Sequence, residues 1–257
     1  MIVSLQATSK WWPIGHLVPG VKMNAQISLA SQDLRAAGPK GQAALGRGPK
    51  QASAFTSFTW RAFDVLVASA ILIVTLPFLL LLAAVMWASD PGPLFFVHRR
   101  IGLRGRSFGC IKFRTMRLGG DQILQDHLSR SPAALREWME THKLKNDPRV
   151  TRLGGLVRKL SLDEFPQLIN ILKGEMSIVG PRPIVEAEVE RYGRYFEFYT
   201  HVRPGLTGLW QISGRSDTSY RERVELDVEY IGRKSLMLDT WLLVKTVPAV
   251  LLARGSY

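Results

Sequence analysis

The longest apolar run of the chain extends from Val65 to Ala88 and contains no charged residue. A run of this length can form a helix that crosses a membrane. Pro77 lies at its midpoint, where it removes a helix hydrogen bond and introduces a bend. Both flanks are basic, with Lys40, Arg47, Lys50 and Arg61 before the run and Arg99, Arg100, Arg104, Arg106 and Lys112 after it. Because short basic segments stay in the cytoplasm, the pattern favours entry and exit on one side of the bilayer, and a spanning helix kinked at Pro77 is the alternative.

The remaining pattern predicts a compact α+β fold that is mostly helical. Apolar residues at 168–172 recur at helical spacing, and Lys173-Gly174 ends this run as a last-turn cation and a C-cap glycine do. A short helix is therefore expected to begin at about Asp163. Further helices are expected at 121–145, 185–199, 220–230 and 235–252. Strands are expected only at 94–97 and 107–116, where alternation places Lys112 and Arg114 on one face.

Composition divides the 257 residues into three parts: a flexible basic N-terminal tail at 1–57, a membrane segment at 58–93 and a globular domain at 94–257. The formal net charge of +13 implies an anionic partner. Charge alone does not distinguish nucleic acid, an acidic membrane surface and phosphorylated substrates. Cys110 is the only cysteine, which excludes an intramolecular disulfide and a thiolate metal cluster. We expect it to be a small buried apolar residue.

Two adjacent carboxylates, Asp163 and Glu164, stand at the expected start of the short helix. A helix N-terminus carries unpaired N–H groups and a positive partial charge, which favour an ionised Asp163 and form a seat for phosphate. Ser161 and Glu164 also fit a capping box, so helix capping alone is the alternative explanation. The segment Gly180-Pro181-Arg182-Pro183 follows, and its prolines hold Arg182 extended. A preorganised guanidinium suits bidentate phosphate binding and favours the chemical interpretation.

Several long motifs, in this order, resemble those of the bacterial polyprenyl-phosphate sugar-1-phosphate transferases, the small monotopic phosphoglycosyl transferases. They are Lys145-Asn146-Asp147-Pro148-Arg149-Val150-Thr151, Leu162-Asp163-Glu164-Phe165-Pro166-Gln167-Leu168, Gly180-Pro181-Arg182-Pro183 and Arg203-Pro204-Gly205-Leu206-Thr207-Gly208-Leu209-Trp210-Gln211. The likeness covers residues 61–257. The segments at 210–215 and 254–257 resemble in particular the galactose- and glucose-type initiators of exopolysaccharide synthesis. The resemblance identifies 94–257 as a catalytic domain and implies a re-entrant helix-break-helix at 58–93. Leu76-Pro77 departs from the family, in which many members have Ser-Pro.

The resemblance also implies a reaction. Hexose-1-phosphate, with galactose or glucose expected, would move from a UDP-sugar to undecaprenyl phosphate with release of UMP, as the first membrane step of exopolysaccharide or surface glycan synthesis. Asp163 would be the nucleophile that forms a covalent aspartyl phosphosugar, and Glu164 would hold Mg²⁺. Phosphate groups are assigned to Arg158, Arg182, Arg203, Arg215, Lys112 and Arg114. Pro77 would form the break in the membrane. The expected place is the bacterial inner membrane, with the catalytic domain on the cytoplasmic face.

Two alternatives stay open. The first is the same chemistry on an N-acetylated amino sugar. The second is a non-enzymatic, basic, membrane-anchored protein that binds nucleic acid or a partner complex, which explains the charge but not an Asp-Glu pair beside a proline-flanked arginine. The sequence contains no GxGxxG, GxxxxGK[ST] or HExxH pattern. The expected partners are therefore a UDP-sugar, undecaprenyl phosphate and the bilayer, without nucleic acid and with a homodimer left open.

Overall fold

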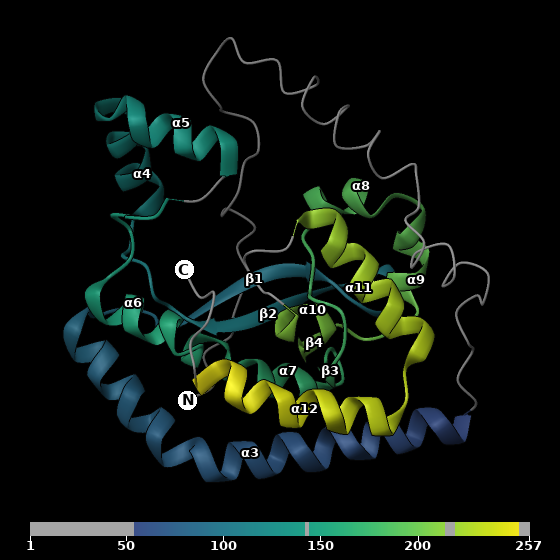
Figure 1. The fold of residues 1–257 in the computed structure, drawn as a ribbon. Helices are drawn as coiled ribbons and strands as arrows, with labels where there is room; N and C mark the ends of the chain where they lie inside the picture. The colour runs from purple at the N-terminus through teal and green to yellow at the C-terminus, as the bar shows by residue number, and fades with distance from the viewer. Residues whose placement is uncertain (1–53, 142–143, 214–218, 252–257) are drawn as a thin grey trace.

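The computed structural model describes residues 54–141, 144–213 and 219–251. In this part of the chain the fold is α+β and mostly helical, as predicted (Figure 1). Of the predicted tail at 1–57, residues 1–53 lie outside the described residues. The helices are α3 Ala54–Ser89, α4 Gly120–Arg130, α5 Pro132–Thr141, α6 Arg152–Lys159, α7 Gln167–Lys173, α8 Val189–Tyr192, α9 Phe196–Thr200, α10 Leu209–Ile212, α11 Tyr220–Arg233 and α12 Leu236–Leu251. The strands are β1 Phe95–Ile101, β2 Ser107–Phe113, β3 Ser177–Val179 and β4 Gly205–Thr207. Short 3-10 turns occupy Leu103–Gly105, Leu162–Glu164, Glu186–Glu188 and Gly193–Tyr195.

Helix α3 runs continuously from Ala54 to Ser89 and passes through Pro77. Figure 1 shows it lying along the base of the molecule and bending upward towards α6 at its C-terminal end. A helix continues through a proline when nearby groups compensate for the lost hydrogen bond. Pro77 leaves the carbonyl oxygen of Ile73 without its helical N–H donor. In the preceding turn, the Thr75 hydroxyl donates to the carbonyl oxygen of Ile71 at 2.7 Å. The helix therefore shows a bend where a break was expected, and the re-entrant path through the bilayer stays a prediction.

Both ends of α3 are attached to the same body. Near its N-terminus, Asp64 accepts hydrogen bonds from the Ser177 hydroxyl and the Ile178 backbone N–H, each at 2.8 Å. Near its C-terminus, Met86 belongs to a buried cluster with Phe113 and Val157. The predicted division between 58–93 and 94–257 stays a prediction. The packing nevertheless joins α3 to the globular part at both ends.

Two small sheets position the later segments. The predicted strands form the antiparallel hairpin β1–β2, with Phe95 opposite Phe113 and Ile101 opposite Ser107. The expectation of no further strands is wrong, since β3 and β4 pair in parallel. This pairing brings Gly180 against Gly205, where a Cβ on either glycine would collide with the backbone of the other. Glycine therefore permits the close approach that fixes the adjoining Pro181-Arg182-Pro183 segment.

The helix expectations hold in part. Helices α11 and α12 confirm the predictions for 220–230 and 235–252. The single helix expected at 121–145 is two helices, because α4 ends at Arg130 and Pro132 begins α5. The amphipathic helix expected at 185–199 is a series of short α-helical and 3-10 segments, and Gly193 with a φ of 49° interrupts it.

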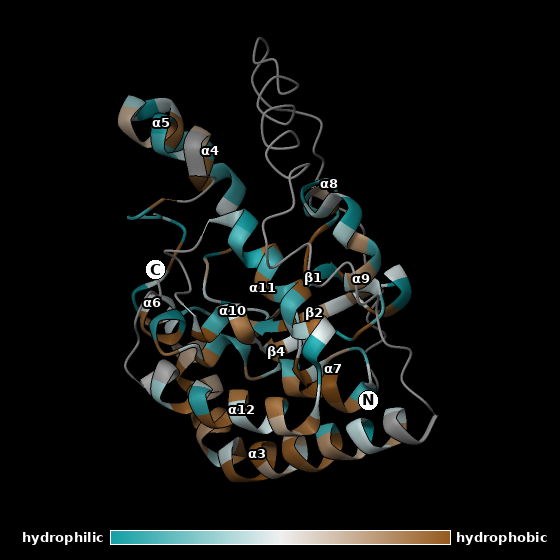
Figure 2. Cartoon of the chain, turned by 45° about the vertical axis from the view of Figure 1, so that its right-hand side comes forward, coloured by the Kyte–Doolittle hydropathy of each residue, from teal (hydrophilic) through white to brown (hydrophobic). Residues whose placement is uncertain are grey.

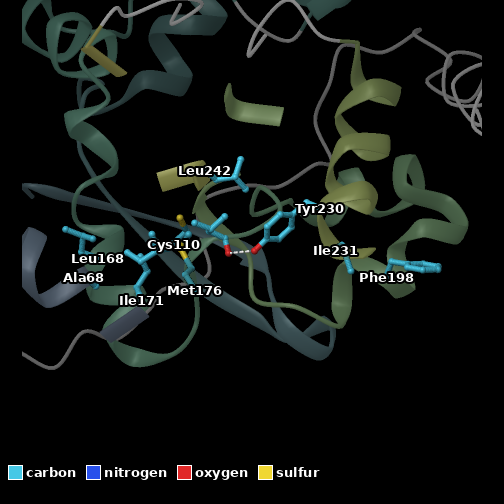
Figure 3. Close-up of a cluster of buried hydrophobic side chains, with 11 residues drawn as sticks. Ala68, Cys110, Leu168, Ile171, Met176, Phe198, Tyr230, Ile231 and Leu242 are labelled. Atoms are coloured by element: carbon cyan, nitrogen blue, oxygen red, sulfur yellow. Dashed lines mark hydrogen bonds between the residues drawn. The ribbon is translucent and has the colours of Figure 1, made fainter. Parts of the chain in front are cut away.

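The main hydrophobic core lies between α3, α7, β2, β3, α11 and α12. Leu168, Ile171, Met176 and Leu242 are among its buried side chains (Figure 3). Cys110 lies in this core, as expected for a small apolar residue. The Tyr230 hydroxyl donates to the carbonyl oxygen of Val179 at 3.0 Å, which Figure 3 shows as a dashed line. This bond ties α11 to the small parallel sheet.

An extended apolar surface covers the base of the molecule. Figure 2 shows hydrophobic colouring along α3 and α12. Helix α3 is long and apolar enough to cross a membrane, and little of its apolar window is buried. The exposed large side chains of these two helices are Phe58, Leu66, Ile73, Val74, Leu76, Phe78, Leu80, Leu81, Val85, Trp87, Met237, Trp241, Val244 and Val247. So much contiguous apolar surface is typical of a protein that contacts lipid.

Candidate active site

The two carboxylates lie in the 3-10 turn Leu162–Glu164, between α6 and α7. The prediction that the helix begins at about Asp163 is wrong, since α7 begins at Gln167 after Pro166. Ser161 has a φ of 56° and its side chain makes no capping hydrogen bond, so the capping box of the alternative explanation is not formed. This left-handed residue turns the chain sharply between α6 and the carboxylates. The turn itself, and not a helix N-terminus, sets the position of Asp163.

Lys112 of β2 contacts both carboxylates. Its Nζ lies 2.6 Å from Oε1 of Glu164 and 3.7 Å from Oδ2 of Asp163. The side chains of Asp163 and Glu164 remain 14% and 28% exposed, so a ligand can still reach them. Lys112 was predicted as a phosphate ligand, and the structure places it beside the two carboxylates. An ion pair of this kind, partly shielded from water, is stronger than an exposed one.

Asn170 of α7 holds β2 in the register that this contact requires. Its side-chain oxygen accepts a hydrogen bond from the Ile111 N–H at 3.0 Å. Its side-chain nitrogen donates to the Gly109 carbonyl oxygen at 2.7 Å and to Glu175 Oε2 at 2.6 Å. Asn170 is fully buried. Because Lys112 follows Ile111, this amide fixes the strand that carries the lysine against the helix that follows the carboxylates.

Burial and charge act against each other on the two carboxylates. Burial raises the pKa of Asp163; Lys112 and Arg158 oppose this increase, whereas Glu164 adds to it. Burial would also raise the pKa of Glu164, but Lys112 and Arg182 outweigh it and hold that pKa below its usual value. The expected help from a helix N-terminus is absent because α7 starts later. The ionised state of Asp163 therefore depends on the cations around it.

Beside the carboxylates lies an open pocket with a basic wall. Its lining residues are Arg100, Cys110, Lys112, Glu164, Gln167, Arg182, Pro183, Gly205, Leu206 and Gln211. The guanidinium carbon of Arg182 lies 5.6 Å from the centre of the Trp210 ring, a cation–π distance. The structure thus brings Arg182 to the same pocket as Glu164 and Lys112. Three cations facing one carboxylate suit a ligand with more than one negative charge.

Arg158 lies on the other side of the carboxylates, in the last turn of α6. Its Nε donates to the Thr115 hydroxyl at 2.7 Å, and its positive charge lowers the pKa of Asp163. Burial lowers the pKa of Arg158, whereas Asp163 and Asp147 raise it. The structure therefore places Arg158 close to Asp163, and its role as a phosphate ligand stays a prediction.

Two of the predicted phosphate ligands lie elsewhere. Arg114 follows the end of β2 and binds Asp90 beyond the C-terminus of α3, through the carbonyl oxygen and through an ion pair at 3.5 Å. Arg203 donates from Nε to the Gly174 carbonyl oxygen at 2.8 Å, at the C-terminal end of α7. Helix α7, which has seven residues and is about 10 Å long, separates that end from the turn that carries the carboxylates. Arg215 lies outside the described residues.

Comparisons with known proteins match the sequence to a family. Residues 55–253 match the family model described as bacterial sugar transferase. The chain belongs to the bacterial sugar transferase family.

Relatives of this bacterial sugar transferase include proteins whose names state an activity or a pathway. An exopolysaccharide production protein, ExoY, of Sinorhizobium fredii is 55% identical over 197 residues, which cover 77% of this chain and 87% of that protein. The undecaprenyl-phosphate galactose phosphotransferase of Salmonella typhimurium is 44% identical over 203 residues, covering 78% of this chain and 42% of that protein. The UDP-glucose:undecaprenyl-phosphate glucose-1-phosphate transferase of Escherichia coli is 37% identical over 206 residues, covering 77% and 41%. The chain thus spans less than half of the latter two relatives.

Sequence reasoning missed several polar residues of the pocket in this sugar transferase, among them Arg100 and Gln167. Arg100 donates to the Pro183 carbonyl oxygen at 3.1 Å and lies 3.8 Å from Glu188, which anchors the Arg182 segment to β1. Arg100 lies four residues after Phe96 in β1, so strand alternation puts both side chains on one face of the hairpin. Because Phe96 pairs with Lys112, the same alternation could have placed Arg100 on the face that carries Lys112. Gln167 is buried at the start of α7, and no signal in one sequence separates it from a core residue.

The carboxylates of the sugar transferase fit a magnesium ion that is shared with a ligand. Mg²⁺ in phosphate chemistry commonly uses one or two protein carboxylates, with the remaining positions filled by water and substrate oxygens. Within the described residues no group of three or more acidic, histidine or cysteine side chains gathers as a closed metal site. Glu164 is partly exposed and directed into the pocket, so the donor set suits an ion that arrives with phosphate.

Proposed function

We propose that this protein transfers hexose-1-phosphate from a UDP-sugar, with galactose or glucose expected, to undecaprenyl phosphate and releases UMP. The observation that carries the proposal is the contact of Lys112 with both Asp163 and Glu164, beside a pocket lined by Arg100 and Arg182. Relatives named as galactose and glucose transferases to undecaprenyl phosphate support the same substrates. The ExoY relative supports a role at the start of exopolysaccharide or surface glycan synthesis.

The reaction would proceed in two displacements. A carboxylate oxygen of Asp163 attacks the phosphorus that bears the hexose, and the bond between this phosphorus and the bridging oxygen breaks, so that UMP leaves with the electron pair. An oxygen of undecaprenyl phosphate then attacks the same phosphorus and displaces Asp163. The products are UMP and undecaprenyl diphosphate hexose. No proton or redox equivalent is needed from outside the substrates.

The chain's own residues have distinct tasks in this scheme. Lys112 keeps the two carboxylates ionised and holds Glu164 in place. Arg182 and Arg100 face the diphosphate of the donor, and Arg158 stabilises the ionised Asp163. Magnesium held at Glu164 would neutralise charge on the diphosphate as it breaks.

Membrane attachment supports the lipid acceptor. The exposed apolar side chains of α3 and α12 would place the domain at the bilayer surface. Both ends of α3 contact one globular body, which is hard to combine with ends on opposite faces of a hydrocarbon layer about 30 Å thick. We therefore place the protein at the inner membrane, with the catalytic domain on the cytoplasmic face and α3 entering from that side.

A panel of UDP-sugars, assayed for UMP release with and without undecaprenyl phosphate, tests the proposal. We expect UMP release sustained by the lipid acceptor with UDP-galactose or UDP-glucose, and loss of release after chelation of Mg²⁺. Preference for UDP-N-acetylhexosamines would support the alternative substrate. No UMP release with any sugar would favour the non-enzymatic alternative.

A further inference from the structure

Arg203 lies away from the catalytic pocket and needs another explanation. Its Nε donates to the carbonyl oxygen of Gly174, the residue that ends α7. Arg61 of α3 reaches the same helix end, since Nη1 donates to Ile171 at 2.5 Å and Nη2 to Leu172 at 2.6 Å. The guanidinium carbon of Arg61 lies 3.6 Å from the place that a Cβ on Gly174 would take. Two guanidinium groups thus meet at one glycine.

A third arginine adjoins this pair. Arg104 belongs to the turn between β1 and β2, and this turn packs against α9. Gly105, the next residue, lies near Thr200, since a Cβ on this glycine would be 4.0 Å from the Thr200 side chain. Thr200 in turn precedes Arg203 by three residues. Arg104 is exposed, and within the described part of the chain its side chain forms no hydrogen bond or ion pair. We refer to Arg61, Arg104 and Arg203 as the arginine triad.

The positive charge of the triad is only partly balanced. Burial lowers the pKa of Arg203, and the charges of Arg61 and Arg104 lower it further, whereas Asp64 opposes them. Asp64 accepts its hydrogen bonds from Ser177 and Ile178 of β3, so it is engaged elsewhere. Arg104 also has a φ of 57°, a left-handed conformation that an arginine adopts less readily than a glycine. The turn keeps a charged side chain where glycine would be less strained.

The triad lies at the edge of the apolar base. Arg61 is part of α3, whose neighbouring Phe58 and Leu66 are 72% and 71% exposed. Figure 2 shows the hydrophobic colouring of α3 along the base, below the strands and α9. A cation that borders an apolar surface of this kind lies at the level of lipid headgroups when that surface enters a bilayer.

We propose that the arginine triad binds the phosphate of an anionic phospholipid headgroup at the membrane surface. Guanidinium groups suit phosphate oxygens, and the adjacent apolar side chains suit the acyl chains. The site is distinct from the catalytic pocket, because the length of α7 separates a phosphate at Arg203 from Asp163. The proposal therefore does not depend on sugar transfer, and it requires only that α3 lies in the bilayer.

Lipid retention measures this site directly. Full-length protein would be reconstituted in nanodiscs that contain phosphatidylglycerol and phosphatidylcholine in equal amounts, extracted gently, and analysed by native mass spectrometry for bound lipid. The variants are Arg104→Gln and Arg203→Gln. Arg130→Gln, an equal change of charge at an exposed position of α4, is the matched control. UMP release in detergent is measured for Arg104→Gln in parallel.

We expect the wild type and Arg130→Gln to retain phosphatidylglycerol preferentially. Arg104→Gln and Arg203→Gln should each lose about fivefold of this preference. UMP release by Arg104→Gln should be unchanged in detergent. Because Arg203→Gln also removes the bond to Gly174, Arg104→Gln decides the test if the other variant fails to fold.

Three results would overturn the proposal. The first is an unchanged lipid preference in Arg104→Gln, or an equal loss in Arg130→Gln. The second is displacement of phosphatidylglycerol by inorganic phosphate, which would reassign the triad to a free anion. The third is selective retention of undecaprenyl phosphate over phosphatidylglycerol by the same residues, which would assign the triad to the acceptor.

Discussion

At the scale of single residues, Lys112 is the cation that most opposes the effect of burial on the two carboxylates. Its charge lowers the pKa of both Asp163 and Glu164, against a burial that raises both. Its ammonium group also contacts Glu164 at 2.6 Å. A neutral residue at this position would leave two adjacent, partly buried carboxylates with less compensation.

We therefore expect Lys112→Met to shift the acid limb of the kcat/KM profile to higher pH by about one unit. Removal of the cation raises both pKa values, so the carboxylates stay protonated to higher pH and activity falls more at pH 6 than at pH 8. The pH dependence of UMP release measures the shift. Lys173→Met, which removes an exposed cation at the other end of α7, should leave the profile in place. A uniformly lower profile of unchanged shape for Lys112→Met would contradict this account.

The limits of sequence reasoning are clearest at this scale. The Asp163-Glu164 pair, Lys112, Arg158 and Arg182 could be selected from motifs, and the structure brings them together. Arg114 and Arg203 come from equally basic motifs, yet they bind Asp90 and Gly174. The direction of a long side chain depends on which backbone groups lie near it in the fold. One sequence does not contain that information.

At the scale of elements, α7 links the carboxylates to the rest of the fold. Asn170 joins α7 to β2, and Arg61 joins α7 to α3. The helix itself could be predicted from apolar spacing, but its start was placed too early because 3-10 turns and α-helices share the same local signals. The parallel pair β3–β4 was missed because each strand has three residues, too few for alternation to appear.

Asn170→Ala should lower both stability and turnover. It removes three hydrogen bonds and leaves the partly buried Ile111 N–H without its acceptor, which costs about 1–3 kcal/mol. Thermal unfolding in detergent should then shift down by several degrees. Gln122→Ala removes an exposed amide that bonds only Asp126 on α4, and should change the unfolding temperature little. Equal unfolding temperatures for Asn170→Ala and the wild type would show that the amide does not hold β2.

At the scale of the whole molecule, the proposed single-sided path of α3 rests on the attachment of its two ends to one globular body. The apolar run and its basic flanks could be found from sequence, whereas the bend in a continuous helix could not, because it depends on packing at both ends. A single-sided path keeps both ends of α3 and the globular domain in one compartment.

Cysteine labelling tests this topology. Cys110 is buried, so Ser57→Cys and Ser89→Cys introduce exposed thiols near the two ends of α3 with little background. We expect both thiols in spheroplasts to react with a membrane-impermeant maleimide only after the membrane is permeabilised, as should Ser129→Cys on the exposed surface of α4. Labelling of one end of α3 in intact spheroplasts would demonstrate a spanning helix.

The most direct test of the central claim is the intact mass of the protein after incubation with its UDP-sugar donor in the absence of lipid acceptor. The account predicts a wild-type species heavier by one hexose phosphate, located by peptide mapping at Asp163 and discharged when undecaprenyl phosphate is added. Asp163→Asn should fold, acquire no adduct and release no UMP. Sustained turnover by Asp163→Asn, or an adduct on another residue, would contradict the assignment of Asp163 as the nucleophile.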